Sequence, residues 1–97
     1  MIQVKLLPEA SEEFVASAAF YESIQRGLGQ SFIDEVEKTL NRIAEHPKAA
    51  RIVVGNFRQR LVHRFPFAVV YQLRGDQAIV AAIAHRRRRP GYWQSRT

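Results

Sequence analysis

The 97-residue sequence contains no cysteine, and it has only one methionine and one tryptophan. The absence of cysteine excludes disulfide bonds, thiol catalysis and cysteine-ligated zinc together. No apolar run approaches the roughly 18 residues of a membrane span, and the first residues, MIQVKLLPEAS, do not follow the plan of a secretion signal. We therefore expect a cytoplasmic protein without membrane association, and the length predicts a single domain over residues 1–97.

Histidines are few and acidic residues are almost absent from the second half of the chain. His46, His63 and His85 match no metal-ligand spacing, so we expect neither a metal nor another cofactor. Residues 1–46 carry four Lys/Arg and eight Asp/Glu, whereas residues 47–97 carry eleven Lys/Arg and one Asp. The second half has a net charge of +10, which indicates an anionic partner, either nucleic acid or an acidic protein segment.

Two helices are expected in the first half of the chain. Residues 2–7 alternate apolar and polar side chains and predict a strand, and a helix follows over residues 8–25. The glycines of RGLGQ (residues 26–30) predict a tight turn. The second helix ends at residues 46–47, because the residue before a proline is disfavoured in helical geometry. Its continuous apolar stripe consists of Leu28, Phe32, Val36, Leu40 and Ile43.

Strand-like patterns fill the second half. Residues 51–54 are a short candidate strand, residues 57–65 alternate, and residues 67–73 and 78–84 are apolar runs separated by a hairpin turn. The last run is apolar on both faces, as expected of a central strand. We expect its small residues, Ala78, Ala81, Ala82 and Ala84, to let the helices approach the sheet closely. We predict an α+β fold of order β-α-α-β-β-β, or the same order with residues 51–54 as an extra strand. A helical hairpin packs on one face of a mostly antiparallel sheet.

Arginines recur at every second position in part of this region. The alternation of FRQRLVHRF (residues 57–65) predicts that Arg58, Arg60 and Arg64 share one strand face, about 7 Å apart in steps of two. Like charges on one face repel, so the arrangement favours a surface that binds an anion. The alternative is a charged edge strand that resists aggregation.

The stretch HRRRRPGYW (residues 85–93) is the most basic part of the chain. Arginine binds phosphate in a forked geometry, and His85 or Tyr92 could transfer protons. Tyr92 and Trp93 are expected to pack near the sheet. Because no acidic residue follows Asp76, RNA cleavage at this cluster would be metal-free.

Several local strings in this order resemble the RelE/ParE toxins of type II toxin–antitoxin modules over nearly the whole chain. The strings are an A-x-x-x-F pattern with Tyr21 in the first helix, GLGQSF, the HP stop at residues 46–47, FRQRLVHRFPFAVVY and AIVAAIAHRRRRPGYW. Each string is weak alone, whereas their order is specific. The resemblance implies the β-α-α-β-β-β fold and a toxin held inactive by an antitoxin. It also implies growth inhibition and the plasmid stabilization typical of such modules.

The family divides by target. The resemblance implies that RelE-like members, which cleave mRNA in the ribosome, carry an arginine just after the first aromatic residue of the FAVVY strand, where this chain has Ala68. It also implies an arginine past the last strand and a tyrosine six residues on, which Arg86 and Tyr92 match. His85 is similar to a histidine of some ribosome-dependent toxins. The two long helices and RFPFAVVY look more ParE-like.

Three functions are consistent with this resemblance. We favour a ParE-like toxin that poisons DNA gyrase by binding and is not an enzyme. The second is a ribosome-dependent mRNA endoribonuclease with His85, Arg86 and Tyr92 as catalytic residues, assisted by Arg58 or Arg60. The third is an antitoxin-binding protein without toxicity.

In each case the expected partner is a cognate antitoxin with an acidic or amphipathic segment, held in a hetero-oligomer. The residues expected to bind nucleic acid or antitoxin are Arg58, Arg60, Arg64, Arg87, Arg88, Arg89 and Trp93.

Overall fold

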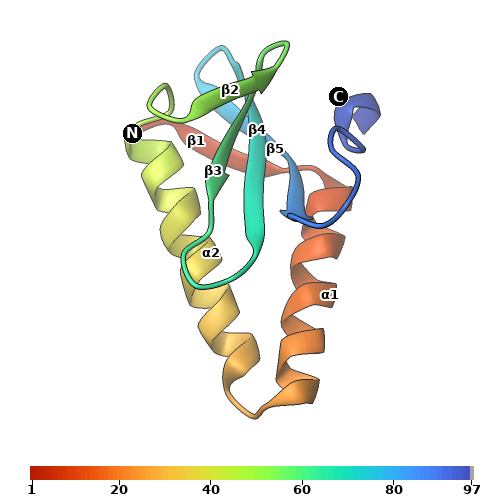
Figure 1. Cartoon of the computed structure of the whole chain (residues 1–97). Coiled ribbons are helices and arrows are strands. Elements are labelled where there is room, and N and C mark those ends of the chain that lie inside the picture. Colours follow the sequence, from red (N-terminus) through yellow and green to blue (C-terminus); the bar gives the residue numbers. More distant parts are fainter. Residues whose placement is uncertain (97) are drawn as a thin grey trace.

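The computed structural model describes residues 1–96, and two layers make up most of it (Figure 1). The first layer is a helical hairpin of α1 (Pro8–Ile24) and α2 (Leu28–Glu45). The second layer is a five-stranded sheet in the order β1-β5-β4-β3-β2. The strands are β1 (Gln3–Leu6), β2 (Arg51–Val54), β3 (Phe57–Leu61), β4 (Phe67–Arg74) and β5 (Gln77–His85), and a short 3-10 turn, η1, covers Gln94–Arg96.

The sheet is antiparallel except at one edge, where β1 runs parallel to β5. This topology confirms the predicted α+β class, and β2 is the extra strand that the sequence allowed. The predicted apolar stripe of α2 is also confirmed, since Phe32, Val36 and Ile43 are buried and the other two members pack against the same core. Within residues 1–96, neither helix is both long enough and apolar enough to cross a bilayer.

The turn between the helices depends on two glycines and one glutamate. Gly27 has φ +88°, a conformation that L side chains rarely adopt, and a Cβ on Gly29 would lie 2.6 Å from the carbonyl oxygen of Ala18. The Glu22 carboxylate accepts hydrogen bonds from both glycine amides, at 3.0–3.1 Å. A negative charge at the start of α2 is favourable because the first helical amides lack partners there.

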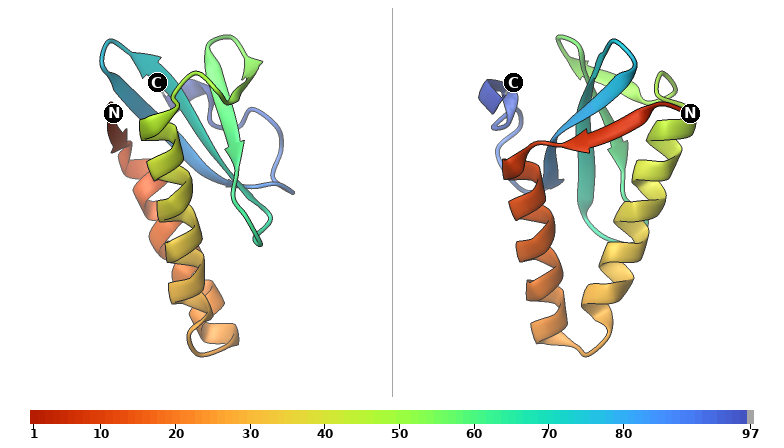
Figure 2. Two further views of the ribbon diagram at one scale, coloured as in Figure 1. Left: turned by 90° about the vertical axis from the view of Figure 1, so that its left-hand side faces the viewer. Right: turned by 180° about the vertical axis from the view of Figure 1, so that it is seen from behind.

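The two faces of the sheet are covered differently, and this corrects one expectation. The helices cover one face, where Val69 and Tyr71 lie in the larger core. The second face carries a smaller core that includes Trp93 of the C-terminal segment (residues 86–96), which crosses this side of the sheet (Figure 2). Ala81, Ala82 and Ala84, expected to face the helices, belong to the second core. The register shift between Val70 and Tyr71 produces this result, because it leaves Ala81 as an extra residue in β5.

The predicted strand over residues 57–65 is too long. β3 ends at Leu61, and Val62 and Phe65 are both buried in the core, three positions apart. A regular strand cannot point both inward, because its side chains alternate between the faces. The chain therefore leaves the sheet here, and Arg64 adopts φ +74° in the loop before β4. Arg64 does not share a strand face with Arg58 and Arg60.

Candidate functional site

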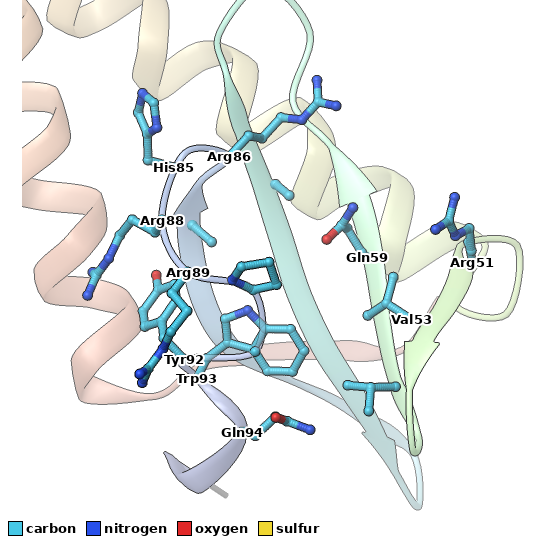
Figure 3. Close-up of a pocket in the computed structure, with 15 residues that line it drawn as sticks. Arg51, Val53, Gln59, His85, Arg86, Arg88, Arg89, Tyr92, Trp93 and Gln94 are labelled. Atoms are coloured by element: carbon cyan, nitrogen blue, oxygen red, sulfur yellow. The ribbon is translucent and has the colours of Figure 1, made fainter.

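A cavity of about 450 Å³ opens between the C-terminal segment and the sheet face that the helices leave uncovered (Figure 3). Its floor includes Ala68 and Ala84, which are cross-strand partners in β4 and β5. Two small side chains side by side leave a hollow in the sheet surface. We refer to this cavity as the cationic pocket because four arginines line it: Arg51, Arg86, Arg88 and Arg89.

The indole of Trp93 fixes one wall of the cationic pocket. Trp93 is 5% exposed and packs edge-on against Phe57 of β3, with ring centroids 4.6 Å apart. Such pairs add about 0.5–1.5 kcal/mol beyond the burial of their area. The start of the segment is anchored separately, because the Arg86 amide donates to the Pro66 carbonyl at 2.8 Å. The expected packing of the two C-terminal aromatic residues near the sheet is confirmed.

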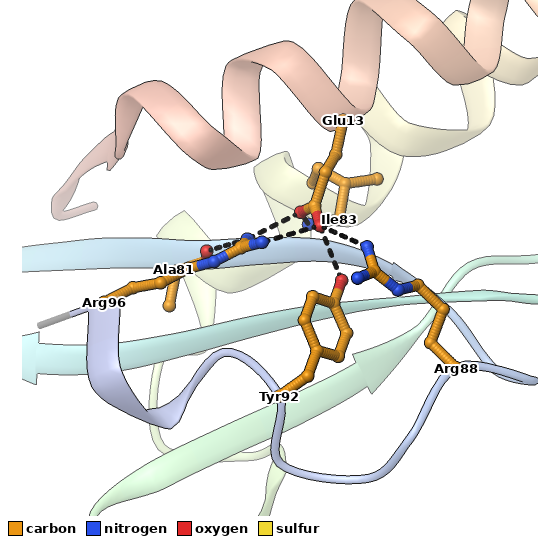
Figure 4. A network of polar contacts seen from close by, with 6 residues as sticks. All are labelled: Glu13, Ala81, Ile83, Arg88, Tyr92 and Arg96. Carbon is orange, nitrogen blue, oxygen red and sulfur yellow. Dashed lines mark hydrogen bonds and ion pairs between the residues drawn. The ribbon is translucent and has the colours of Figure 1, made fainter.

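Glu13 of α1 holds the C-terminal segment in place (Figure 4). Its carboxylate accepts hydrogen bonds from the Tyr92 hydroxyl at 2.6 Å and from both Nη atoms of Arg96, at 2.9 and 3.1 Å. It also accepts from Arg88 Nη1 at 3.3 Å and from the Ile83 amide at 3.0 Å. The side chain of Glu13 is only 14% exposed, so these charge-assisted contacts are shielded from water. We call Glu13, Arg88, Tyr92 and Arg96 the carboxylate cluster.

The cluster also completes the edge of β5. Strand β1 pairs with β5 only as far as the Leu6–Val80 partners, so the following residues of β5 have no neighbouring strand on that side. Glu13 accepts from the Ile83 amide, and Arg96 donates to the Ala81 carbonyl at 3.0 Å. The Glu13–Arg96 ion pair therefore forms hydrogen bonds with two backbone groups of β5, the Ile83 amide and the Ala81 carbonyl, that a longer β1 would otherwise bind.

Tyr92 is constrained in both geometry and protonation. Burial, the hydrogen bond to Glu13 and the negative charge of Glu13 raise the pKa of Tyr92 to about 12, against the opposing effect of two arginines. The Arg88 guanidinium lies 3.8 Å from the centre of its ring. The Tyr92 hydroxyl is thus a donor committed to a carboxylate within the protein.

His85 lies at the end of β5, on the border of the cationic pocket. Its ring packs edge-on against Phe67 at 5.1 Å, and its Nδ1 atom accepts a hydrogen bond from the Arg87 amide at 3.0 Å. That contact leaves Nε2 as the remaining nitrogen able to meet a ligand. His85 also lines a second, mostly apolar groove of about 350 Å³ beside α1, where Phe20 is 61% exposed.

The structure places the predicted site residues in three settings. Arg64 lies in the loop before β4, and the exposed Arg87 is absent from the lining of the cationic pocket. His85, Arg86, Arg88, Arg89, Tyr92 and Trp93 line the cationic pocket. Arg58 and Arg60 pair with Tyr71 and Val69 and thus share the opposite, helix-covered face of the sheet. The sheet separates Arg58 and Arg60 from Arg86 and Tyr92, so the idea that they assist this cluster is wrong. His85 pairs with Phe67 and its ring lies on the helix-covered face, yet neither cavity that it lines includes Arg58 or Arg60.

Arg58 has a local structural task. Its Nη1 atom donates to the carbonyls of Lys48 and Ala50, at 3.0 and 2.9 Å, and ties the α2–β2 connection to the sheet. Beside it the buried Tyr71 hydroxyl donates to the Pro47 carbonyl at 2.6 Å. Burial raises the pKa of Tyr71, and the charges of Arg58 and Arg60 oppose that rise. The Arg60 Nε atom is buried without a hydrogen-bond partner in the described residues.

Five charged or amide residues at the site were not predicted: Glu13, Arg96, Arg51, Gln59 and Gln94. Glu13 belongs to a group of acidic residues near the start of α1, which the sequence explains as favourable charges at a helix N-terminus. Its 79-residue separation from Tyr92 leaves no local signal. Gln59 alternates with Arg58 and Arg60 along β3, so its side chain lies on the other sheet face and lines the cationic pocket. Among residues 1–96, no group of three or more His, Cys, Asp and Glu side chains could hold a metal ion.

The fold defines a class, a two-layer α+β protein with a helical hairpin on one sheet face, and in this chain the other face carries the cationic pocket. The sequence profile of the ParE toxin of the type II toxin–antitoxin system, parDE, matches residues 4–90. The chain belongs to this family.

A solved structure described as the chromosomal ParDE TA system from P. aeruginosa contains a similar chain, with a TM-score of 0.74 and 17% sequence identity. The match covers 88% of this chain and 96% of that chain. At this identity the likeness shows the fold. A comparison with curated proteins gave no match.

Proposed function

We propose that this ParE-family toxin acts in the cytoplasm by poisoning DNA gyrase through binding, and that a cognate antitoxin neutralises it. One observation carries the choice of target. Ala68, at the position where the ribonuclease branch carries an arginine, lines the floor of the cationic pocket. A pocket floored by two alanines lacks the charge that would stabilise a phosphorane-like transition state at that point.

The state of Tyr92 supports the same choice. A metal-free cleavage needs side chains that accept and donate a proton near the pH of the cell. The pKa of Tyr92 is about 12 and its hydroxyl already donates to Glu13. We therefore interpret Tyr92 as a residue that holds the C-terminal segment, and Arg86 as a binding residue. The proposal that His85, Arg86 and Tyr92 catalyse RNA cleavage stays the alternative.

The first experiment measures gyrase trapping. Supercoiled plasmid, purified gyrase and ATP are incubated with the protein, and the reaction is stopped with detergent and protease. We expect linear plasmid to accumulate as the toxin concentration rises, because a poison arrests the enzyme on cleaved DNA. A type I topoisomerase serves as the control enzyme and should show no such product.

The competing activity is tested on the same preparation. A reporter mRNA is translated in a purified system with and without the protein, and primer extension maps its ends. Discrete cuts that require ribosomes, together with no linear plasmid, would reverse the assignment in favour of the endoribonuclease. If the folded protein gives neither product and does not inhibit growth, the third function, antitoxin binding without toxicity, replaces both.

The antitoxin contact is proposed from charge. The basic half of the chain suits an acidic, amphipathic segment, and the apolar groove beside α1 ends at His85 and Arg88. Electrostatic binding of this kind weakens as salt rises, because the Debye length falls from about 10 Å at 0.1 M to about 3 Å at 1 M. An affinity that stays constant over this range would contradict the charge-based contact.

A further inference from the structure

Three arginines of the cationic pocket have no acidic partner within residues 1–96. Arg88 shares the Glu13 carboxylate with Arg96, whereas Arg51, Arg86 and Arg89 form neither an ion pair nor a side-chain hydrogen bond with the described residues. Arg51 comes from β2, and the other two come from the C-terminal segment on the opposite side of the cavity (Figure 3). Guanidinium groups on both sides of one opening repel one another unless an anion lies between them.

The interior of the pocket is apolar and has the size of a small-molecule site. Ala68, Ala84, Val53, Pro90 and Trp93 contribute to its lining. The volume of about 450 Å³ falls within the range of about 300–1,000 Å³ that is typical of ligand pockets. An inorganic anion would leave this interior empty, so the ligand should combine an anionic group with an apolar or planar part.

Two side-chain amides identify the planar part. Gln59 and Gln94 both line the pocket, and neither side chain hydrogen-bonds to another described residue. An amide presents one donor and one acceptor side by side, which is the pattern that matches the edge of a nucleobase. Arginines that can bind phosphate, an apolar interior the size of a base and two free amides are together the features expected of a nucleotide site.

We propose that the cationic pocket binds one nucleotide of an unpaired strand, with the base in the cavity and the flanking phosphates on Arg51, Arg86 and Arg89. DNA and RNA share this chemistry. The inference rests on the proposed action on gyrase in one respect: the strand is assigned as DNA, which gyrase opens and cleaves, so the toxin would touch the DNA as well as the enzyme.

The test uses fluorescence anisotropy of the full-length protein without gyrase. The probes are a labelled single-stranded DNA of about ten nucleotides, the RNA of the same sequence, the corresponding DNA duplex and an Asp/Glu-rich peptide. We expect the single strand to bind more tightly than the duplex, because only its bases can enter the cavity. Equal or tighter binding of DNA relative to RNA supports the DNA assignment, and binding confined to RNA overturns it.

Substitutions that fill the cavity test whether a nucleotide binds inside it or whether nucleic acid is attracted only by the positive surface charge. Ala68→Leu and Ala84→Leu keep every arginine and add bulk to the floor. Each should weaken single-strand binding about fivefold or more, since a stacked base contributes about 1–3 kcal/mol. Gln59→Leu is a third variant, which removes an amide and keeps the charge, and we expect it to weaken binding less. Circular dichroism confirms that each variant is folded.

Substitutions of charge provide the matched control. Arg86→Gln and Arg89→Gln should each lower the salt dependence of log Kd by about 0.7, the value for one phosphate contact on a single strand. Arg26→Gln and Arg42→Gln remove the same charge from exposed positions outside the pocket lining and should leave that slope unchanged.

Two results would overturn the proposal. Unchanged binding by all three cavity and amide variants would mean that only surface charge attracts nucleic acid. Binding of the acidic peptide that the cavity variants abolish, with no single-strand binding, would make the pocket a peptide site. Neither result depends on gyrase, so this inference and the gyrase assay can fail separately.

Discussion

The hydroxyl of Tyr92 lies 2.6 Å from Oε2 of Glu13, although 79 positions separate the two residues in the chain. This contact joins the first helix to the C-terminal segment and positions Arg88 at the border of the cationic pocket. The site thus depends on a carboxylate from the acidic half of the chain. The predictions that follow separate residues that hold the site from residues that would meet a ligand.

Glu13→Gln should destabilise the protein by about 2–3 kcal/mol, because a neutral amide cannot replace charge-assisted hydrogen bonds to two arginines and a tyrosine. Urea unfolding measures the change. Glu12→Gln is the matched control, since Glu12 is exposed in the same turn of α1 and forms no ion pair in the described residues. Equal effects of the two substitutions would show that the carboxylate cluster does not stabilise the fold.

Alkaline pH should destabilise the protein through Tyr92. The pKa of Tyr92 is about 12 in the folded state and about 10 in the unfolded state, so the folded protein retains a proton that the unfolded chain releases. The stability from this residue is therefore complete below pH 10 and falls as the pH rises towards 12.

Absorbance of tyrosinate, compared between the wild type and Tyr92→Phe, checks this assignment. All three tyrosines of the wild type should ionise above the ordinary pKa of about 10, and Tyr92→Phe should remove the component with a pKa of about 12. Tyr21 and Tyr71 also have raised pKa values because of burial, so the difference between the two proteins is the informative quantity. No difference above pH 10 would contradict the Tyr92–Glu13 hydrogen bond.

Gly29→Ala should cost about 1–3 kcal/mol, in the range of overpacking a tight contact. The new methyl group would lie 2.6 Å from a main-chain oxygen of α1, which cannot move as a flexible side chain can. Thermal unfolding of this variant, with Gln30→Ala at the adjacent exposed position as control, gives the measurement. A stabilised Gly29→Ala would mean that the helices of the hairpin lie further apart.

Arg58→Gln should lower stability without affecting binding, and Arg86→Gln should weaken binding without affecting stability. Arg58 donates to two main-chain carbonyls, so its loss should lower stability by about 1–2 kcal/mol and leave binding at the cationic pocket unchanged. The exposed Arg86 side chain should affect binding and not stability. The two measurements are urea unfolding and anisotropy. Loss of binding in Arg58→Gln would contradict its position on the far face of the sheet.

Sequence patterns predicted the fold well because each element carries its own local signal. The five apolar positions of α2 repeat at helical spacing and face one core, and the β4 and β5 runs are continuously apolar because both of their faces are covered. The strand over residues 57–65 was drawn too long for a physical reason. In the sequence, the alternating pattern continues as far as Arg64. The chain nevertheless leaves the sheet after Leu61, because Val62 and Phe65 are both buried in the core.

The candidate site was predicted only in part. The run from His85 to Trp93 is contiguous, so its members were found together, and six of the predicted residues do line one cavity. Arg58 and Arg60 were misplaced because alternation groups side chains on a face without saying which face meets the helices. Cross-strand pairing with Val69 and Tyr71 decides that question.

By itself the sequence determined the element order, the helical core stripe, the basic half of the chain and the family to which the chain belongs. These features depend on residues close together in the chain, whose spacing records their local conformation. The tertiary structure alone decided that the C-terminal segment covers the second sheet face, that Glu13 and Arg96 complete the edge of β5, and that two paired alanines open a pocket beneath arginines. Each of these features depends on contacts between segments that are distant in the chain. Burial strengthens such contacts, but they produce no regular spacing of residues from which the sequence could predict them.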